Sequence, residues 1–454
     1  MKKTFVLMMA IMMIAVVFAG CSKSSNEAAT TAPATAAPTA APATEAPATE
    51  SPTPEPVKQV TIKVMNYTPN GGQEETYAEM VKLFEAANPG IKVDSQILAY
   101  ADYFTKLNTV IGSGSSVPDV FEVGYEGFAS YAAKNVLLDL SSTIAADTAF
   151  KPDVYKKLAY DAFNYNGKQY GVSESFSNVI LYYNKDLFDA KKVGYPQPDW
   201  TWKEELEAAQ KLTDAKAGVW GTFAPIQFYE FFKTVAQNGG GIWGKDNKTL
   251  TINSKENVEA LNWMLDKARK YKVSPALNDD TFNQPDADLN AFKAGKLAML
   301  RAGVWNLGSF TKDAKFKWDI ALEPGNTQKA HHFFADGLVA SSTTKNADAV
   351  WKYIKFMSSD PAAVGVRIAK GWSIPAVADP ATMDAYYKMT PPDSRKYISE
   401  ALDSLVLPPV GPIPDKWNDL QKAVSGELDK AKLGRLDAKK ALDNAQANAE
   451  KLLK

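Results

Sequence analysis

The chain has 454 residues, of which 45% are hydrophobic and 23% are charged. Because a single hydrophobic core stops growing near ~250–300 residues, this length predicts two lobes rather than one. The 51 basic side chains nearly balance the 52 acidic ones, so no net field draws the protein to nucleic acid or to anionic lipid. A nucleic-acid partner is therefore not expected, and any ligand must be recognised locally.

The N-terminus has the pattern of an export signal. Two lysines precede an unbroken uncharged run over residues 5–18, which is too short to span a bilayer permanently. Small residues then lead to Cys21, the only cysteine of the chain. Residues 18–21 resemble a bacterial lipobox, which implies removal of residues 1–20, diacylglycerol on the Cys21 thiol and anchoring at the extracytoplasmic face of the cell membrane. The alternative is an ordinary signal peptide beside an incidental cysteine.

The stretch from Cys21 to residue 56 predicts a disordered tether. Residues 22–56 contain no Leu, Ile, Val or aromatic side chain and consist almost wholly of Ala, Pro, Thr, Ser and Glu, so they cannot bury enough apolar surface to offset the entropy of folding. The prolines favour extended polyproline II, which at ~3.1 Å per residue could hold the folded part up to roughly 100 Å from the membrane. A glycosylated or merely disordered spacer predicts the same mechanics.

From residue 57 the pattern is typical of an α/β fold. Residues 60–64 alternate as a strand does, residues 77–84 have helical spacing, and Asn88-Pro89-Gly90 separates this helix from a second strand at Ile91. Such alternation favours a largely parallel sheet, in which ligands lie at the carboxyl ends of the strands. Later strands are expected at residues 119–121 and 178–183, and later helices at residues 103–111, 202–212, 258–268 and 348–357 and after about residue 412.

The sequence offers little catalytic chemistry. The two histidines, His331 and His332, are adjacent and therefore poorly placed to act together from one face of a helix or strand. No thiol is free of the anchor, which excludes a cysteine nucleophile and any Cys/His metal site. No Gly-rich phosphate loop, Gly-x-Ser-x-Gly elbow or His-Glu-x-x-His sequence occurs. We therefore expect no catalytic residue, metal or cofactor. Paired carboxylates for glycoside cleavage remain an alternative, because their geometry is invisible in a sequence.

A series of short motifs follows in order along residues 57–454. The motifs are VKLFE (81–85), NPGIKV (88–93), PDV (118–120), LLDL (137–140), YGV (170–172), LYYNKDLF (181–188), WTW (200–202), NGG (238–240), FKAGKLAM (292–299) and GVW (303–305). Each motif alone is weak evidence for a protein family, but the order and spacing of the whole set are strong evidence. Nearly all of the mature chain thereby resembles the extracellular carbohydrate-binding family of ABC-importer solute-binding proteins, the group that includes maltose-binding protein.

This resemblance implies a two-lobed periplasmic-binding-protein fold. Each lobe would be a mainly parallel sheet flanked by helices, with a carbohydrate enclosed between the lobes when a hinge closes. The protein would be a monomer that delivers its ligand to the transmembrane subunits of an ABC importer, without cofactor or metal. Lobe 1 would comprise residues 57–172 plus about 330–374, lobe 2 residues 173–329 plus about 375–454, and the crossing segments residues 170–174, 321–332 and 372–375. The alternative function is that of a surface carbohydrate-active enzyme, a glycosidase.

A carbohydrate cleft needs aromatic faces beside planar polar groups, because sugars offer C–H patches that stack and hydroxyls that form hydrogen bonds. Trp305 matches a family tryptophan that forms a stacking face in many relatives, and a core tryptophan is the alternative. The complete set of predicted ligand-binding residues is Tyr67, Glu122, Tyr125, Glu126, Gln227, Phe228, Tyr229, Arg301, Trp305, Asp336, Trp372 and Trp417.

Several of these candidates have structural alternatives. Glu122, Tyr125 and Glu126 follow a predicted strand and would otherwise form a solvated acidic loop, with the tyrosine covering an edge. Arg301 can donate two hydrogen bonds to sugar hydroxyls or to a carboxylate, or form a salt bridge on the surface of a lobe. Phe228 precedes a predicted helix and could instead pack in the core.

Overall fold

The computed structural model divides the chain into two compact units, residues 1–56 and residues 57–454. It describes residues 59–68, 73–371, 374–377 and 380–454. The expected signal peptide, the lipobox cysteine Cys21 and the tether lie outside the described residues, and so does the candidate Trp372. Within the described ranges no helix is both long and apolar enough to cross a membrane.

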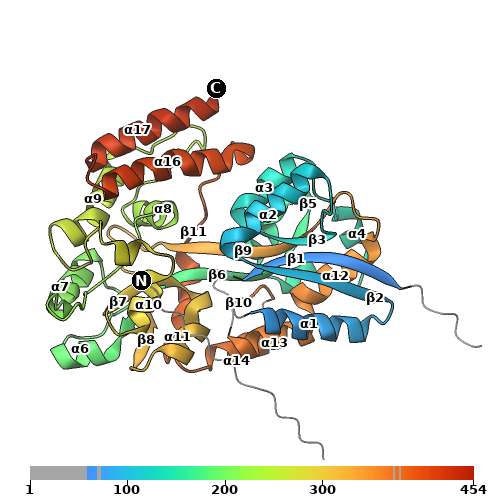
Figure 1. The fold of residues 1–454 in the computed structure, drawn as a ribbon, viewed down its shortest axis with the longest axis horizontal. Coiled ribbons are helices and arrows are strands. Elements are labelled where there is room, and N and C mark those ends of the chain that lie inside the picture. The colour runs from blue at the N-terminus through green and yellow to red at the C-terminus, as the bar shows by residue number, and fades with distance from the viewer. Residues whose placement is uncertain (1–58, 69–72, 372–373, 378–379) are drawn as a thin grey trace, which may run out of the picture. The chain divides into compact units, whose positions relative to one another are not determined.

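Three parallel strands form the first part of the main sheet (Figure 1). Strand β1 pairs with β2 from Val60 opposite Ile91, and with β3 from Val64 opposite Val120. Helix α1 connects β1 to β2 and buries apolar side chains at helical spacing, which confirms the predicted β-α-β unit. The bounds are Val60–Thr68 for β1, Glu74–Ala87 for α1, Ile91–Ala99 for β2, Tyr100–Ser113 for α2 and Val120–Gly124 for β3.

One long strand, β6 (Gly171–Asn184), joins this part of the sheet to a second part. Residues 171–178 of β6 pair antiparallel with β9, and residues 179–184 pair antiparallel with β7 and β8. Strand β9 in turn pairs antiparallel with β3. The bounds are Met299–Gly303 for β7, Trp318–Ala321 for β8 and His331–Ala340 for β9.

The expected mainly parallel pairing therefore holds for β1, β2 and β3, whereas β6 and β9 are antiparallel to most of their neighbours. The chain leaves the first part of the sheet along β6 and returns to it along β9. Two adjacent strands that carry the chain in opposite directions must pair antiparallel, because parallel pairing requires a crossover connection between strands that run the same way.

Helices cover both faces of the first part of the sheet. Figure 1 shows α2 and α3 on one side of strands β1 to β3, and α1, α12 and α13 on the other. Their apolar side chains form one large core with the strands. The bounds are Tyr125–Ala133 for α3, Ala347–Ser359 for α12 and Pro361–Lys370 for α13.

A second hydrophobic core consists mainly of helices, and a third lies where α6 and α7 pack against β6 to β8. Thr201 caps α7 in a capping box with Glu204, so this helix begins at the predicted threonine. The bounds in the second core are Phe228–Gln237 for α8, Lys255–Arg269 for α9, Trp417–Lys432 for α16 and Ala438–Glu450 for α17. The remaining bounds are Ser141–Ala146 for α4, Lys157–Asp161 for α5, Asn164–Tyr165 for β4, Lys168–Gln169 for β5, Lys185–Lys191 for α6, Trp202–Leu212 for α7, Ala287–Lys293 for α10, Leu307–Asp313 for α11, Ile374–Pro375 for β10, Pro380–Tyr387 for α14, Lys396–Glu400 for α15 and Leu405–Val406 for β11.

Candidate ligand-binding site

A cavity of about 420 Å³ opens where several strands end, and this volume falls in the ~300–1,000 Å³ range of small-molecule sites. Residues at or just beyond the carboxyl ends of β1, β2, β3 and β7 line it, as expected for an α/β sheet. Helix α8 and strand β9 supply further walls. The predicted residues that the structure brings together here are Tyr67, Glu126, Gln227, Tyr229, Arg301, Trp305 and Asp336.

Two partly exposed aromatic rings face this cavity from different parts of the sheet. Trp305 follows β7 and meets Phe334 edge to face, with 5.2 Å between the ring centroids and an interplanar angle of 88°. A Cβ atom on Gly303 would lie 2.2 Å from the Trp305 ring, so the indole requires a glycine at this position. Tyr100 follows β2, is 44% exposed and packs edge to face on Tyr67 at 5.2 Å.

Hydroxyl groups of two tyrosines donate hydrogen bonds to two of the carboxylates that line the cavity. The Tyr67 hydroxyl donates to Asp336 Oδ1, and the Tyr229 hydroxyl donates to Glu126 Oε1 at 3.3 Å. Burial, together with the negative charges of Glu126 and Glu174, raises the pKa of Asp336 to about 7, against the opposing effects of the tyrosine hydrogen bond and the Arg367 charge. Burial also raises the pKa of Glu126. Burial is the largest cause of both shifts, although both side chains remain partly exposed at the cavity.

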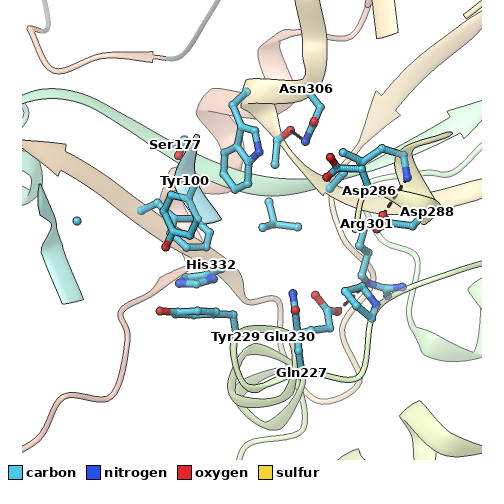
Figure 2. A pocket seen from close by; sticks show the side chains of 18 of the residues that line it. Tyr100, Ser177, Gln227, Tyr229, Glu230, Asp286, Asp288, Arg301, Asn306 and His332 are labelled. Carbon is cyan, nitrogen blue, oxygen red and sulfur yellow. Dashed lines mark hydrogen bonds and ion pairs between the residues drawn. The ribbon is translucent and has the colours of Figure 1, made fainter. Parts of the chain in front are cut away.

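The imidazole of His332 lines the cavity and carries a nitrogen atom without a hydrogen-bond partner among the described residues. The ring of His332 lies nearly parallel to Tyr229, at 5.2 Å and 20°, and Figure 2 shows both side chains on the same side of the cavity as Tyr100. His332 is 1% exposed, and its Nε2 has no hydrogen-bond partner among the described residues. Burial, followed by the Lys233 charge, lowers the pKa of His332 well below its usual value, so the ring is neutral.

Arg301 is committed to buried carboxylates, although it borders the cavity. Its Nη1 and Nη2 donate to the two oxygens of Glu205 at 2.7 and 2.6 Å, and its Nε donates to Glu323 at 3.0 Å. Burial alone would raise the pKa of Glu205, but the charges of Arg301 and Lys267 outweigh it and lower this pKa to about 2. Arg301 therefore forms a salt bridge, which was the alternative interpretation of the sequence. This salt bridge is buried under the cavity rather than exposed on the surface of a lobe.

Four candidates do not line the cavity. Glu122 is 1% exposed, because its Oε2 accepts hydrogen bonds from Asn66 and from the Tyr67 backbone beneath the site rather than facing solvent. Tyr125 and Glu126 are consecutive residues of α3, so their side chains point in different directions, and Tyr125 lines a separate groove. Phe228 and Trp417 pack edge to face in the second core, at 5.5 Å and 76°, because both rings lie among the apolar faces of α8, α9 and α16.

Several lining residues were missed in the sequence. His332 and Phe334 alternate with Asp336 along β9, so the period of two in a strand places all three on one face and would have identified them. Tyr100 follows a strand just as Trp305 does. The other missed polar residues, Ser177, Glu230, Asp286, Asp288 and Asn306, carry no comparable sequence signal. Within the described part of the chain no His, Cys, Asp and Glu side chains are grouped to hold a metal ion.

An α/β sheet with a cavity at the carboxyl ends of its strands is typical of proteins that bind a small solute. Residues 69–364 match the bacterial extracellular solute-binding protein family, and the chain belongs to this family. A solved structure of an ABC substrate-binding protein from Listeria monocytogenes, in complex with cycloalternan, is 44% identical with a TM-score of 0.82, and the alignment covers 87% of this chain and 99% of that one. The likeness confirms the family and the two-lobed α/β fold class predicted from the sequence.

Two curated relatives are more distant. The maltooligosaccharide ABC transporter solute-binding lipoprotein of Streptococcus pneumoniae is 27% identical over 313 residues, which are 66% of this chain and 68% of that protein. The arabinooligosaccharide-binding protein of Bacillus subtilis is 26% identical over 266 residues. The second match spans 57% of this chain and 59% of the relative's length.

Proposed function

We propose that this protein captures a carbohydrate outside the cytoplasmic membrane and delivers it to an ABC importer. The observation that carries this proposal is the cavity, where the partly exposed rings of Tyr100 and Trp305 stand beside carboxylate, amide and imidazole groups. Stacking faces next to planar polar groups are what a sugar requires. The family of the chain and the sugars named for its relatives support the same class of ligand.

The ligand is enclosed between two lobes that close on a hinge. Tyr67, Tyr100 and Glu126 belong to the proposed lobe 1, whereas Gln227 and Trp305 belong to the proposed lobe 2. All five line one cavity, so a sugar bound there would contact both lobes at once. The two-part pairing of β6 supports a crossing between lobes along this strand, and the differential affinity of the ligand for the closed state would drive closure.

The protein acts at the membrane without chemical turnover. We propose that Cys21 carries the lipid anchor at the extracytoplasmic face and that the chain is a monomer, its partner being the importer. The Streptococcus pneumoniae relative is named a lipoprotein, and the relatives are named as binding proteins. The competing function, a glycosidase, requires two carboxylates within ~5–10 Å across the scissile bond.

A thermal-shift screen tests the proposal. Cycloalternan, maltotriose and an arabinotriose are added in turn to the purified protein, because a ligand that binds only the native state stabilises it by about 2.7 kcal/mol at 100-fold excess over Kd. We expect at least one sugar to raise the melting temperature and to be recovered intact after incubation. No shift with any sugar would contradict the proposal, and turnover abolished by mutating an acidic pair would favour the glycosidase.

A further inference from the structure

The walls of the cavity carry an excess of acidic side chains. Glu126, Asp286, Asp288 and Asp336 line it together with Glu230, whose charge Lys233 balances, and among the described residues Arg301 is the one lining side chain with a positive charge. Figure 2 shows Asp286 and Asp288 beside Arg301 on one side of the cavity, while Glu230 lies near Gln227 at the start of α8. An anion that entered would therefore meet carboxylates on more than one wall.

The positive charges near the cavity are already neutralised. Arg301 donates hydrogen bonds from Nη1 and Nη2 to Glu205 and from Nε to Glu323. An incoming carboxylate would therefore have to displace a buried partner. Lys233, directly below, is fully buried between Glu230 at 2.7 Å and Glu323 at 2.5 Å. A buried ion pair that loses one partner leaves an uncompensated charge, which is strongly unfavourable. Neither cation is thus available to receive an anion.

The remaining polar groups suit hydroxyls. Carboxylate oxygens of Glu126 and Asp336 accept hydrogen bonds from tyrosine hydroxyls and have further lone pairs for hydroxyls of a ligand. His332 is buried and carries an Nε2 atom without a partner among the described residues. A neutral imidazole can exchange hydrogen bonds with an alcohol, but it provides no charge for a carboxylate or phosphate.

Behind Asp336 the balance is also acidic. Glu122 on β3 and Glu174 on β6 are each 1% exposed, and Arg367 on α13 pairs with Glu174. The charges of Glu126 and Glu174 already disfavour the ionised form of Asp336 by raising its pKa. A further negative charge in the cavity would add to this repulsion, and it would also lose its hydration without gaining a cationic partner.

From this arrangement we infer that the cavity selects sugars without acidic groups and rejects uronic acids and sugar phosphates. The inference rests on the proposed carbohydrate-binding function and narrows its substrate class. Uncharged sugars meet acceptors and aromatic faces, and amine-bearing sugars would gain attraction, whereas acidic sugars meet the carboxylates of the cavity walls.

The test compares the affinity of an acidic sugar with that of its uncharged analogue. The uronic acid of maltotriose, oxidised at one primary hydroxyl, and the methyl ester of the same compound differ in charge but hardly in shape. Isothermal titration at low salt should show the acid binding at least about tenfold more weakly than the ester, and the gap should narrow at high salt because screening weakens repulsion. The same pair made from cycloalternan and mannotriose extends the test to other frameworks.

Glu126→Gln identifies the source of the rejection, because it removes one facing charge and keeps the shape. We expect this variant to reduce the difference between acid and ester by at least threefold. Glu79→Gln is the matched control, since Glu79 is 52% exposed on α1 and does not line the cavity, and it should leave the difference unchanged. Equal affinity for acid and ester, or binding of acidic sugars alone, would overturn the inference while the carbohydrate function stands. Binding of neither kind would instead contradict the proposed function itself.

Discussion

The ring of Trp305 gives the sharpest test of the cavity as a sugar-binding site. This ring already packs over Gly303 and against Phe334, while the side chain remains partly exposed at the cavity. A sugar that covers ~50–100 Å² of the indole removes this area from water, which contributes about 1–2.5 kcal/mol at ~25 cal/mol per Å². We therefore expect Trp305→Ala to weaken binding of an uncharged sugar by about 5- to 70-fold.

Two measurements separate binding from stability for this variant. Isothermal titration gives the Kd per folded molecule, and urea unfolding gives the stability. Trp243→Ala is the matched control, because Trp243 is also partly exposed but lines a separate groove and donates its Nε1 to the Pro409 carbonyl at 2.8 Å. The control should leave Kd unchanged. If Trp305→Ala instead lowers the free energy of unfolding by ~3–5 kcal/mol, as loss of a fully buried tryptophan does, and leaves Kd unchanged, the ring belongs to the core and the reasoning is refuted.

Three further predictions concern protons, the anchor and motion. Burial raises the pKa of Asp336 to about 7, above the ~3.9 of an unfolded aspartate, so the folded state binds more protons than the unfolded state between these pH values. The free energy of unfolding should therefore fall by about 2–4 kcal/mol from pH 4 to pH 7. Asp336→Asn should flatten this pH profile in urea titrations, and an unchanged slope would contradict the assignment. Cys21→Ser should move the protein from the membrane fraction to unprocessed or soluble form, whereas mass spectrometry that finds an unmodified Cys21 in native membranes would exclude the anchor. Small-angle scattering should give a smaller radius of gyration at saturating ligand, and an unchanged curve would show a preformed cleft rather than lobe closure.

The parts of the fold that depend on local pattern were predictable from the sequence. Periodicity located the first β-α-β unit and the helix that begins after Thr201, because each is fixed by neighbours within a few residues. The strand expected at residues 178–183 is the second half of β6, which begins at Gly171. Its first half pairs with β9, more than a hundred residues later in the chain, and such non-local pairing leaves no local signature.

The candidate site could be predicted to a similar extent, and the prediction of its other residues failed for a similar reason. Residues just beyond strand ends, such as Glu126 and Trp305, were found because strand ends can be located by pattern. In the sequence, Glu122 alternates within its strand like any other polar residue. Only the structure shows that its carboxylate accepts hydrogen bonds from Asn66 and from a backbone amide. The role of Arg301 depends on Glu205, which is distant in sequence, so no spacing rule could assign this pair.

The buried charges below the cavity divide its lining into a fixed part and an adaptable part. Three acidic and three basic side chains interlock there with almost no exposure, namely Glu205, Glu230, Glu323, Lys233, Lys267 and Arg301. Removal of one member leaves an uncompensated buried charge that costs about 3–5 kcal/mol, a large share of the ~5–15 kcal/mol that stabilises a domain. Substitution of Arg301 should therefore show itself first as a lower free energy of unfolding rather than as a change of ligand preference. Tyr100, Glu126 and Trp305 remain partly exposed and have no such network, so a change of sugar preference among related chains should arise from these positions.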